Sequence, residues 1–104
     1  MSKEERIAAA SEIGAGEMKS VDVSGELILL ANVEGRIYAV SDICTHEECT
    51  LSDGGILEGV EVECECHGAR FDVTNGQVTQ EPAEEPLKTY DVSVAGDDVI
   101  VSLD

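Results

Sequence analysis

The sequence predicts an all-β fold, and three features of the chain carry that prediction. Short segments either alternate between apolar and polar side chains or run apolar, and they are rich in β-branched residues. Turn-forming pairs such as Ser24-Gly25 and Glu34-Gly35 separate these segments. No segment sustains the hydrophobic period of a helix. Many short strands joined by regular turns indicate an antiparallel sandwich or barrel.

The elements follow in chain order. Residues 3–8 are predicted as a first strand, although the Ala- and Glu-rich stretch 3–13 also fits a helix on propensity. We favour a strand that runs into a turn. The later predicted strands are short and bounded by turn residues: 18–23, 27–33, 36–41, 60–63, 70–73, 77–79, 87–94 and 99–103. Asn75-Gly76 predicts a hairpin between two of them, because this pair is the strongest short hairpin signal.

Two strand-poor stretches remain, residues 44–55 and 64–69. They are predicted loops, and together they contain every cysteine and histidine of the chain: Cys44, His46, Cys49, Cys64, Cys66 and His67. Loops on a rigid β scaffold are frequent positions for functional residues. We expect one domain over residues 1–104, with its functional loops at about 43–69.

The charge of the chain is strongly negative, with 23 acidic and 6 basic residues. A phosphate backbone repels such a surface, so nucleic acid is a poor partner. Steering of a basic partner protein and simple solubility are equally good explanations. Seven acids and no base lie between Cys44 and His67: Glu47, Glu48, Asp53, Glu58, Glu61, Glu63 and Glu65.

The location follows from what the sequence lacks. No run of about 18 apolar residues is present, so we expect no membrane span. The charged N-terminus has no apolar centre of a secretory signal. We expect a cytoplasmic protein, in which clustered cysteines and histidines indicate metal binding before a disulfide framework.

Each loop offers one thiolate and one imidazole. The first loop reads Cys44-Thr45-His46 and the second reads Cys64-Glu65-Cys66-His67. Two such loops facing each other can bind two metal ions, with the sulfurs on one and the imidazoles on the other. Two Cys and two His are also valid ligands of one structural Zn²⁺ ion. A four-cysteine [2Fe–2S] cluster is disfavoured, because it fits no established spacing and leaves both histidines unused.

The two loops resemble those of the Rieske iron–sulfur family, through Cys44-Thr45-His46 and Cys64-x-x-His67-Gly68. Residues 51–55 resemble the family's segment after the first loop, and residues 69–76 resemble its hairpin after the second. The stretch from Pro82 to Pro86 resembles the proline loop that covers the cluster. The similarity extends over residues 7–101 and is closest to the small soluble Rieske ferredoxins of non-haem iron oxygenase systems.

The resemblance implies an antiparallel Rieske-type β-sandwich with a small cluster-binding subdomain of two loops. It also implies one [2Fe–2S] cluster, with cysteines on one iron and histidines on the other. These ligands are Cys44, Cys64, His46 and His67. Two neutral imidazoles in place of two thiolates raise the potential above that of all-cysteine clusters. Gly68 is expected to permit a tight loop backbone, Leu51 to pack over the first loop, and Pro82 to cover the cluster.

Cys49 and Cys66 stand where the high-potential Rieske proteins link their two loops by a disulfide, and we expect that disulfide here. Ala69 and Phe71 stand where those relatives carry hydroxyl donors to the cluster sulfurs. Fewer such hydrogen bonds lower the potential. The resemblance therefore implies a low-potential ferredoxin, in spite of the cysteine pair.

The expected function is one-electron transfer, from a flavin-dependent reductase to a terminal non-haem iron oxygenase. Both partners are expected to dock near the two histidines, and the carrier is expected to be a monomer and not itself an enzyme. Two alternatives stay open at this point. One is the Rieske subunit of a respiratory or other oxidoreductase complex, and the other is a zinc-bound structural or interaction module.

Overall fold

The computed structural model describes residues 4–23, 25–43, 50–52, 54–65, 68–81 and 85–102. These residues form eleven strands and one 3₁₀ turn, and no α-helix occurs among them. The elements are β1 (Glu4–Ala9), η1 (Ala10–Glu12), β2 (Met18–Val23), β3 (Glu26–Val33), β4 (Arg36–Ser41), β5 (Ile56–Glu58), β6 (Glu61–Glu63), β7 (Arg70–Asp72), β8 (Val78–Gln80), β9 (Thr89–Tyr90), β10 (Val92–Ala95) and β11 (Asp98–Ser102). No described helix has the length and apolar character needed to cross a membrane.

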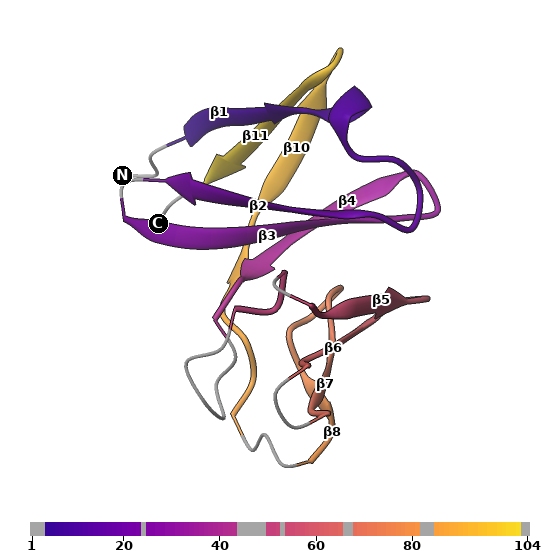
Figure 1. Ribbon diagram of the computed structural model, residues 1–104. Helices are drawn as coiled ribbons and strands as arrows, with labels where there is room; N and C mark the ends of the chain where they lie inside the picture. Colours follow the sequence, from indigo (N-terminus) through magenta and orange to yellow (C-terminus); the bar gives the residue numbers. More distant parts are fainter. Residues whose placement is uncertain are drawn as a thin grey trace.

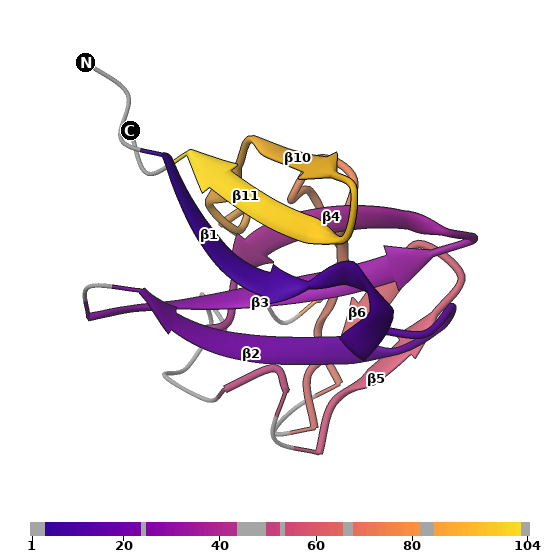
Figure 2. The same ribbon diagram turned by 90° about the horizontal axis from the view of Figure 1, so that it is seen from above.

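The strands build three antiparallel sheets. The first has the order β1-β11-β10, the second β2-β3-β4-β9 and the third β5-β6-β7-β8. The first sheet lies over the second as a two-layer sandwich (Figures 1 and 2). The third sheet lies on the opposite side of the second, at the bottom of Figure 1. This confirms the predicted all-β sandwich with a smaller attached subdomain.

The central strand β3 has a sequence that runs apolar instead of alternating, because both of its faces are buried. Five consecutive residues, 28–32, are buried, because β3 contributes to a separate apolar core on each face of the second sheet. Ile28 and Leu30 belong to the core shared with the first sheet, and Leu29 and Ala31 to the core shared with the third. The second core also contains Leu51, Val62, Cys64, Ala69, Phe71, Val73 and Leu87.

The hairpin between β3 and β4 has the turn that its sequence predicts. Val33 pairs with Arg36, and the two residues between them both have positive φ, 53° at Glu34 and 92° at Gly35. A two-residue turn of this kind matches the twist of the flanking strands. Residues 4–12 form β1 followed by η1, which confirms a strand that runs into a turn and excludes a helix there.

The predicted strand over residues 87–94 is wrong in one respect, because it is divided at Asp91. β9 pairs with β4 in the second sheet, whereas β10 pairs with β11 in the first. The chain thus crosses from one layer to the other without changing its extended character. The strand pattern of the sequence is the same on both sides of the crossing.

Two further differences concern the third sheet. β5 was not predicted, because three residues provide too little alternation to recognise a strand. The hairpin from β7 to β8 is present, but it is longer than a two-residue Asn-Gly turn. Only Gly76 has positive φ, and the Asp72 carboxylate accepts hydrogen bonds from the Thr74 N–H and hydroxyl. This side chain shapes a wider turn than the Asn-Gly pair alone would form.

Candidate metal centre

The first predicted loop is closed at its base by residues on either side of it. Ile43 and Thr50 form an isolated antiparallel bridge, and the Leu51 N–H donates to the Asp42 carbonyl at 2.7 Å. The Asp42 carboxylate accepts hydrogen bonds from the Ser52 N–H at 2.8 Å and the Ser52 hydroxyl at 2.6 Å. The two ends of the loop are therefore held together where it leaves and rejoins the β scaffold.

The second predicted loop is the connection between β6 and β7. Glu63 pairs with Arg70, and the next rung is the hydrogen bond from the Cys64 N–H to the Ala69 carbonyl, at 2.8 Å. The Gly68 N–H then donates to the Cys64 carbonyl at 2.9 Å. Gly68 has φ +76°, a left-handed conformation that glycine adopts without strain.

The chain after the first loop packs tightly against the second loop and its strand. A Cβ added to Gly54 would overlap the carboxylate of Glu65. A Cβ added to Gly55 would overlap the Leu51 carbonyl and approach the Glu63 carbonyl. The Gly54-Gly55 pair thus allows the chain after the first loop to lie against the second loop and its strand.

Cys64 is the predicted ligand that the structure describes, and it is 2% exposed at the base of the second loop. Three other predicted positions share its apolar core and are fully buried: Leu51, Ala69 and Phe71. Leu51 and Phe71 therefore belong to the same apolar cluster as Cys64. Neither Ala69 nor Phe71 carries a hydroxyl, so neither side chain can donate a hydrogen bond to a nearby sulfur.

The segment that follows β8, which is predicted to cover the cluster, is described only at its two ends. The Gln80 side-chain amide donates to the Gly68 carbonyl at 3.1 Å, which ties β8 to the second loop. The Leu87 N–H donates to the Gly76 carbonyl at 2.7 Å, which returns the chain to the same subdomain. Pro82 itself lies outside the described residues.

Cys44, His46, Cys49, Cys66 and His67 also lie outside the described residues. Within the described part of the chain, no group of three or more His, Cys, Asp or Glu side chains is placed to hold a metal ion. The described geometry therefore places the loop bases and one predicted ligand, and the positions of the other three ligands stay predictions.

Arg70 was given no role from the sequence, and its position changes the charge of the site. It ion-pairs with Glu63 at 3.0 Å, Glu61 at 3.3 Å and Glu58 at 3.4 Å. The hydrogen bond to Glu63, followed by the one to Glu61, raises the pKa of Arg70 above its ordinary value. The acidic stretch of the sequence is thus partly neutralised by a base that lies just beyond it in the chain.

Asp42 and Ser52 were also missed as site residues. The available signal was an acidic residue at the end of an apolar strand, two positions before Cys44. An acid in that context needs hydrogen-bond donors if it is buried, and Asp42 is fully buried. The sequence alone does not show that the donors are supplied by Ser52, on the far side of the loop.

The fold brings the bases of the two predicted loops together on a β scaffold, with Cys64 buried at the base of the second. The model of the Rieske [2Fe–2S] domain matches residues 3–91, so the chain belongs to the Rieske [2Fe–2S] family. The described residues fit the family's cofactor, because Cys64 offers a thiolate at a buried, backbone-tied position. The chain's cofactor is therefore one Rieske [2Fe–2S] cluster, and this replaces the zinc module as an explanation of the ligands.

Relatives of the chain are ferredoxin components of dioxygenase systems. The ferredoxin component of a naphthalene 1,2-dioxygenase system from Pseudomonas aeruginosa is 42% identical over 95 residues, covering 91% of this chain and 90% of that protein. The ferredoxin of carbazole 1,9a-dioxygenase from Nocardioides aromaticivorans IC177 superposes with a TM-score of 0.90 at 32% identity, covering 95% and 96%. A complex of reduced oxygenase and oxidized ferredoxin in carbazole 1,9a-dioxygenase contains a chain with the same TM-score and identity, covering 95% and 92%.

Proposed function

We propose that this chain is the ferredoxin component of a multicomponent oxygenase system and that it carries one electron at a time. The observation that carries the proposal is the β6–β7 hairpin, which holds Cys64 buried beside the closed base of the first loop. That arrangement occurs in a chain of the Rieske family whose relatives are dioxygenase ferredoxins. The cluster supplies one-electron redox chemistry, and the chain is a carrier and not a catalyst.

The proposed ligands are Cys44 and Cys64 on one iron and His46 and His67 on the other. The structural support is the position of Cys64, whose backbone N–H and carbonyl are both bonded within its own loop. These two hydrogen bonds fix the backbone of Cys64 at the base of the loop. His67 directly precedes Gly68, which has positive φ and is bonded to Cys64 and Gln80.

We propose a low reduction potential for a Rieske protein. The support is that Ala69 and Phe71, both fully buried in the core that contains Cys64, have no hydroxyl to stabilise the reduced state. The proposed Cys49–Cys66 disulfide would join the two loops covalently and reduce their conformational freedom. It acts in addition to the closure of the first loop by Asp42 and Ser52.

The proposed partners are a flavin-dependent reductase and a terminal non-haem iron oxygenase, each docking near the two histidines. The oxygenase partner is supported by the solved complex of a structurally similar ferredoxin with its oxygenase. The net charge of −17 favours partners with basic docking surfaces. A cytoplasmic location and a monomeric carrier remain part of this proposal.

The test is the visible and electron paramagnetic resonance spectrum of protein purified without oxygen, before and after dithionite. We expect a red-brown protein with a rhombic signal after reduction, at a lower average g value than all-cysteine clusters give. A second arm adds a flavin-dependent ferredoxin reductase with NADH, which should reduce the protein. A colourless protein that contains zinc would overturn the carrier proposal.

The ligand set has its own test in His67→Cys. We expect poor cluster retention and, in the cluster that remains, a lower potential, because a thiolate adds negative charge. Ser93→Cys, which introduces the same thiol at an exposed position of β10, is the control and should leave the potential unchanged. An unchanged potential in His67→Cys would remove His67 from the ligand set while leaving the carrier function intact.

A further inference from the structure

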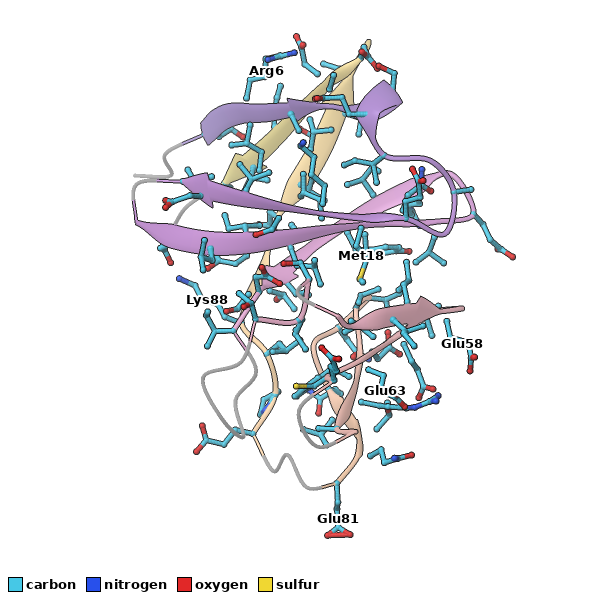
Figure 3. The ribbon with its side chains drawn as sticks, viewed as in Figure 1. Arg6, Met18, Glu58, Glu63, Glu81 and Lys88 are labelled. Carbon is cyan, nitrogen blue, oxygen red and sulfur yellow. The ribbon has the colours of Figure 1, made fainter. Side chains whose placement is uncertain are left out.

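The outer face of the third sheet carries a row of charged side chains directly beside the second loop. In the register of β5, β6 and β7, Glu58 stands opposite Glu61 and Glu63 opposite Arg70, so these four side chains share one face. Asp72, also opposite Glu61, has its carboxylate bound to the Thr74 N–H and hydroxyl. Figure 3 shows Glu58 and Glu63 on the same side of this sheet. The opposite face carries Leu57, Val62 and Phe71, which pack into the core.

Arg70 lies at the centre of this row. Its Nε is 3.0 Å from Glu63, and its Nη1 is 3.3 Å from Glu61 and 3.4 Å from Glu58. It is also the only Lys or Arg between Arg36 and Lys88 in the sequence. The side chain of Arg70 is 28% exposed, so solvent screens it less than a fully exposed base.

The strand pair that carries Glu63 and Arg70 is next to the base of the second loop. Glu63 pairs with Arg70 in the register, and the next hydrogen bond joins Cys64 to Ala69. The charged group is therefore attached to the last strand pair before the predicted ligands Cys64 and His67. Reduction adds negative charge at that end of the hairpin, which nearby carboxylates disfavour and a nearby cation favours.

We propose that Arg70 is a tuning residue that raises the reduction potential of this ferredoxin by offsetting Glu58, Glu61 and Glu63. This inference rests on the proposed ligation through Cys64 and His67. The four side chains carry a net charge of −2, from three carboxylates and one guanidinium, and the loss of the guanidinium leaves −3. The carboxylates alone would lower the reduction potential further, and the guanidinium offsets part of that effect.

The direct test compares the reduction potentials of cluster-loaded Arg70→Gln and Arg6→Gln, each at low and high salt. Both variants lose one positive charge from an ion pair, but Arg6 pairs with Asp98 in the first sheet, in the other half of the molecule. We expect Arg70→Gln to lower the potential more than Arg6→Gln does. The difference should shrink with salt, because the group is partly exposed.

A charge-restoring variant separates this tuning role from a purely structural one. Arg70→Gln combined with Glu61→Gln returns the group to −2 without restoring the ion pairs, so we expect the potential to return toward the starting value. Glu61→Gln alone should raise the potential, and this arm is informative even if Arg70→Gln assembles poorly. Equal shifts in the two arginine variants, or no recovery in the double variant, would overturn the proposal. A protein without the reduced cluster signal would instead count against the proposed function.

Discussion

Both carboxylate oxygens of the fully buried Asp42 accept hydrogen bonds from Ser52, one from its backbone N–H at 2.8 Å and one from its hydroxyl at 2.6 Å. The two residues flank the first loop, so the contact fastens its two ends together. A buried carboxylate is tolerated only when such donors satisfy it. The stability of the loop base should therefore depend on Ser52, although Ser52 is not a predicted ligand.

Replacing Ser52 by Ala removes the hydroxyl, so that Oδ2 of Asp42 loses the hydrogen bond it accepts from Ser52. We expect a loss of about 1–3 kcal/mol in the free energy of unfolding, the usual cost of leaving a buried hydrogen-bond acceptor unsatisfied. Urea unfolding monitored by cluster absorbance measures it. Ser93→Ala, on an exposed position of β10, is the control and should change little. Equal stability of the two variants would contradict the role assigned to this contact.

Replacing Gly55 by Ala should destabilise the junction between the two loops. The added Cβ would overlap the Leu51 carbonyl and crowd the Glu63 carbonyl, and backbone atoms cannot move aside as a flexible side chain can. We expect a cost of about 1–3 kcal/mol, typical of overpacking, together with faster loss of the cluster on heating. In Gly14→Ala the nearest atoms belong to the Glu17 side chain, so this control should be tolerated better. Similar melting temperatures for both variants would refute the prediction.

Replacing Ala69 by Ser should raise the reduction potential. Ala69 is fully buried in the core that contains Cys64, and its carbonyl accepts the Cys64 N–H at 2.8 Å. A hydroxyl placed there can donate to a cluster sulfur and stabilise the reduced state. Protein-film voltammetry measures the shift. Ala39→Ser introduces the same hydroxyl in the core of the sandwich and should leave the potential unchanged. No difference between the two variants would mean that residue 69 does not face the cluster.

Tyr90 predicts a loss of stability at high pH. Burial, followed by the hydrogen bond that its hydroxyl donates to Glu26 at 3.1 Å, raises the pKa of Tyr90 to about 12. An unfolded tyrosine ionises near pH 10, so the unfolded chain loses this proton before the native chain does. The contribution of Tyr90 to stability is therefore fully present below about pH 10 and is lost as the pH rises toward about 12.

The ultraviolet titration of tyrosinate in a Tyr38→Phe variant isolates Tyr90 and should show this late ionisation. Tyr90→Phe should remove the corresponding fall in the urea midpoint at alkaline pH. A titration midpoint close to that of free tyrosine would show that Glu26 and burial do not hold the proton. Neither variant alters Lys88, whose ammonium lies 4.9 Å from the centre of the Tyr90 ring.

Local patterns in the sequence predicted the parts of the fold that depend on neighbours along the chain. Alternation located β2 and β4 at the observed bounds, and Glu34-Gly35 predicted the two-residue turn between β3 and β4. The two loop motifs predicted the Rieske [2Fe–2S] cofactor, because ligand types and their spacing are local properties, and the assignment of the individual ligands stays a prediction. Gly68 stands in one of these motifs, and it has positive φ, which glycine adopts without strain.

Only the tertiary structure decided which distant residues meet. It divided the predicted strand over residues 87–94 at Asp91 between two sheets, since an extended segment looks the same whichever sheet it joins. It placed Ser52 against Asp42 and Arg70 against Glu58, Glu61 and Glu63, so that a charged stretch without a base became partly neutralised. Sequence determines the residue types and their local periods, whereas the pairing of charges and buried polar groups depends on strand register, which forms only when the sheets assemble.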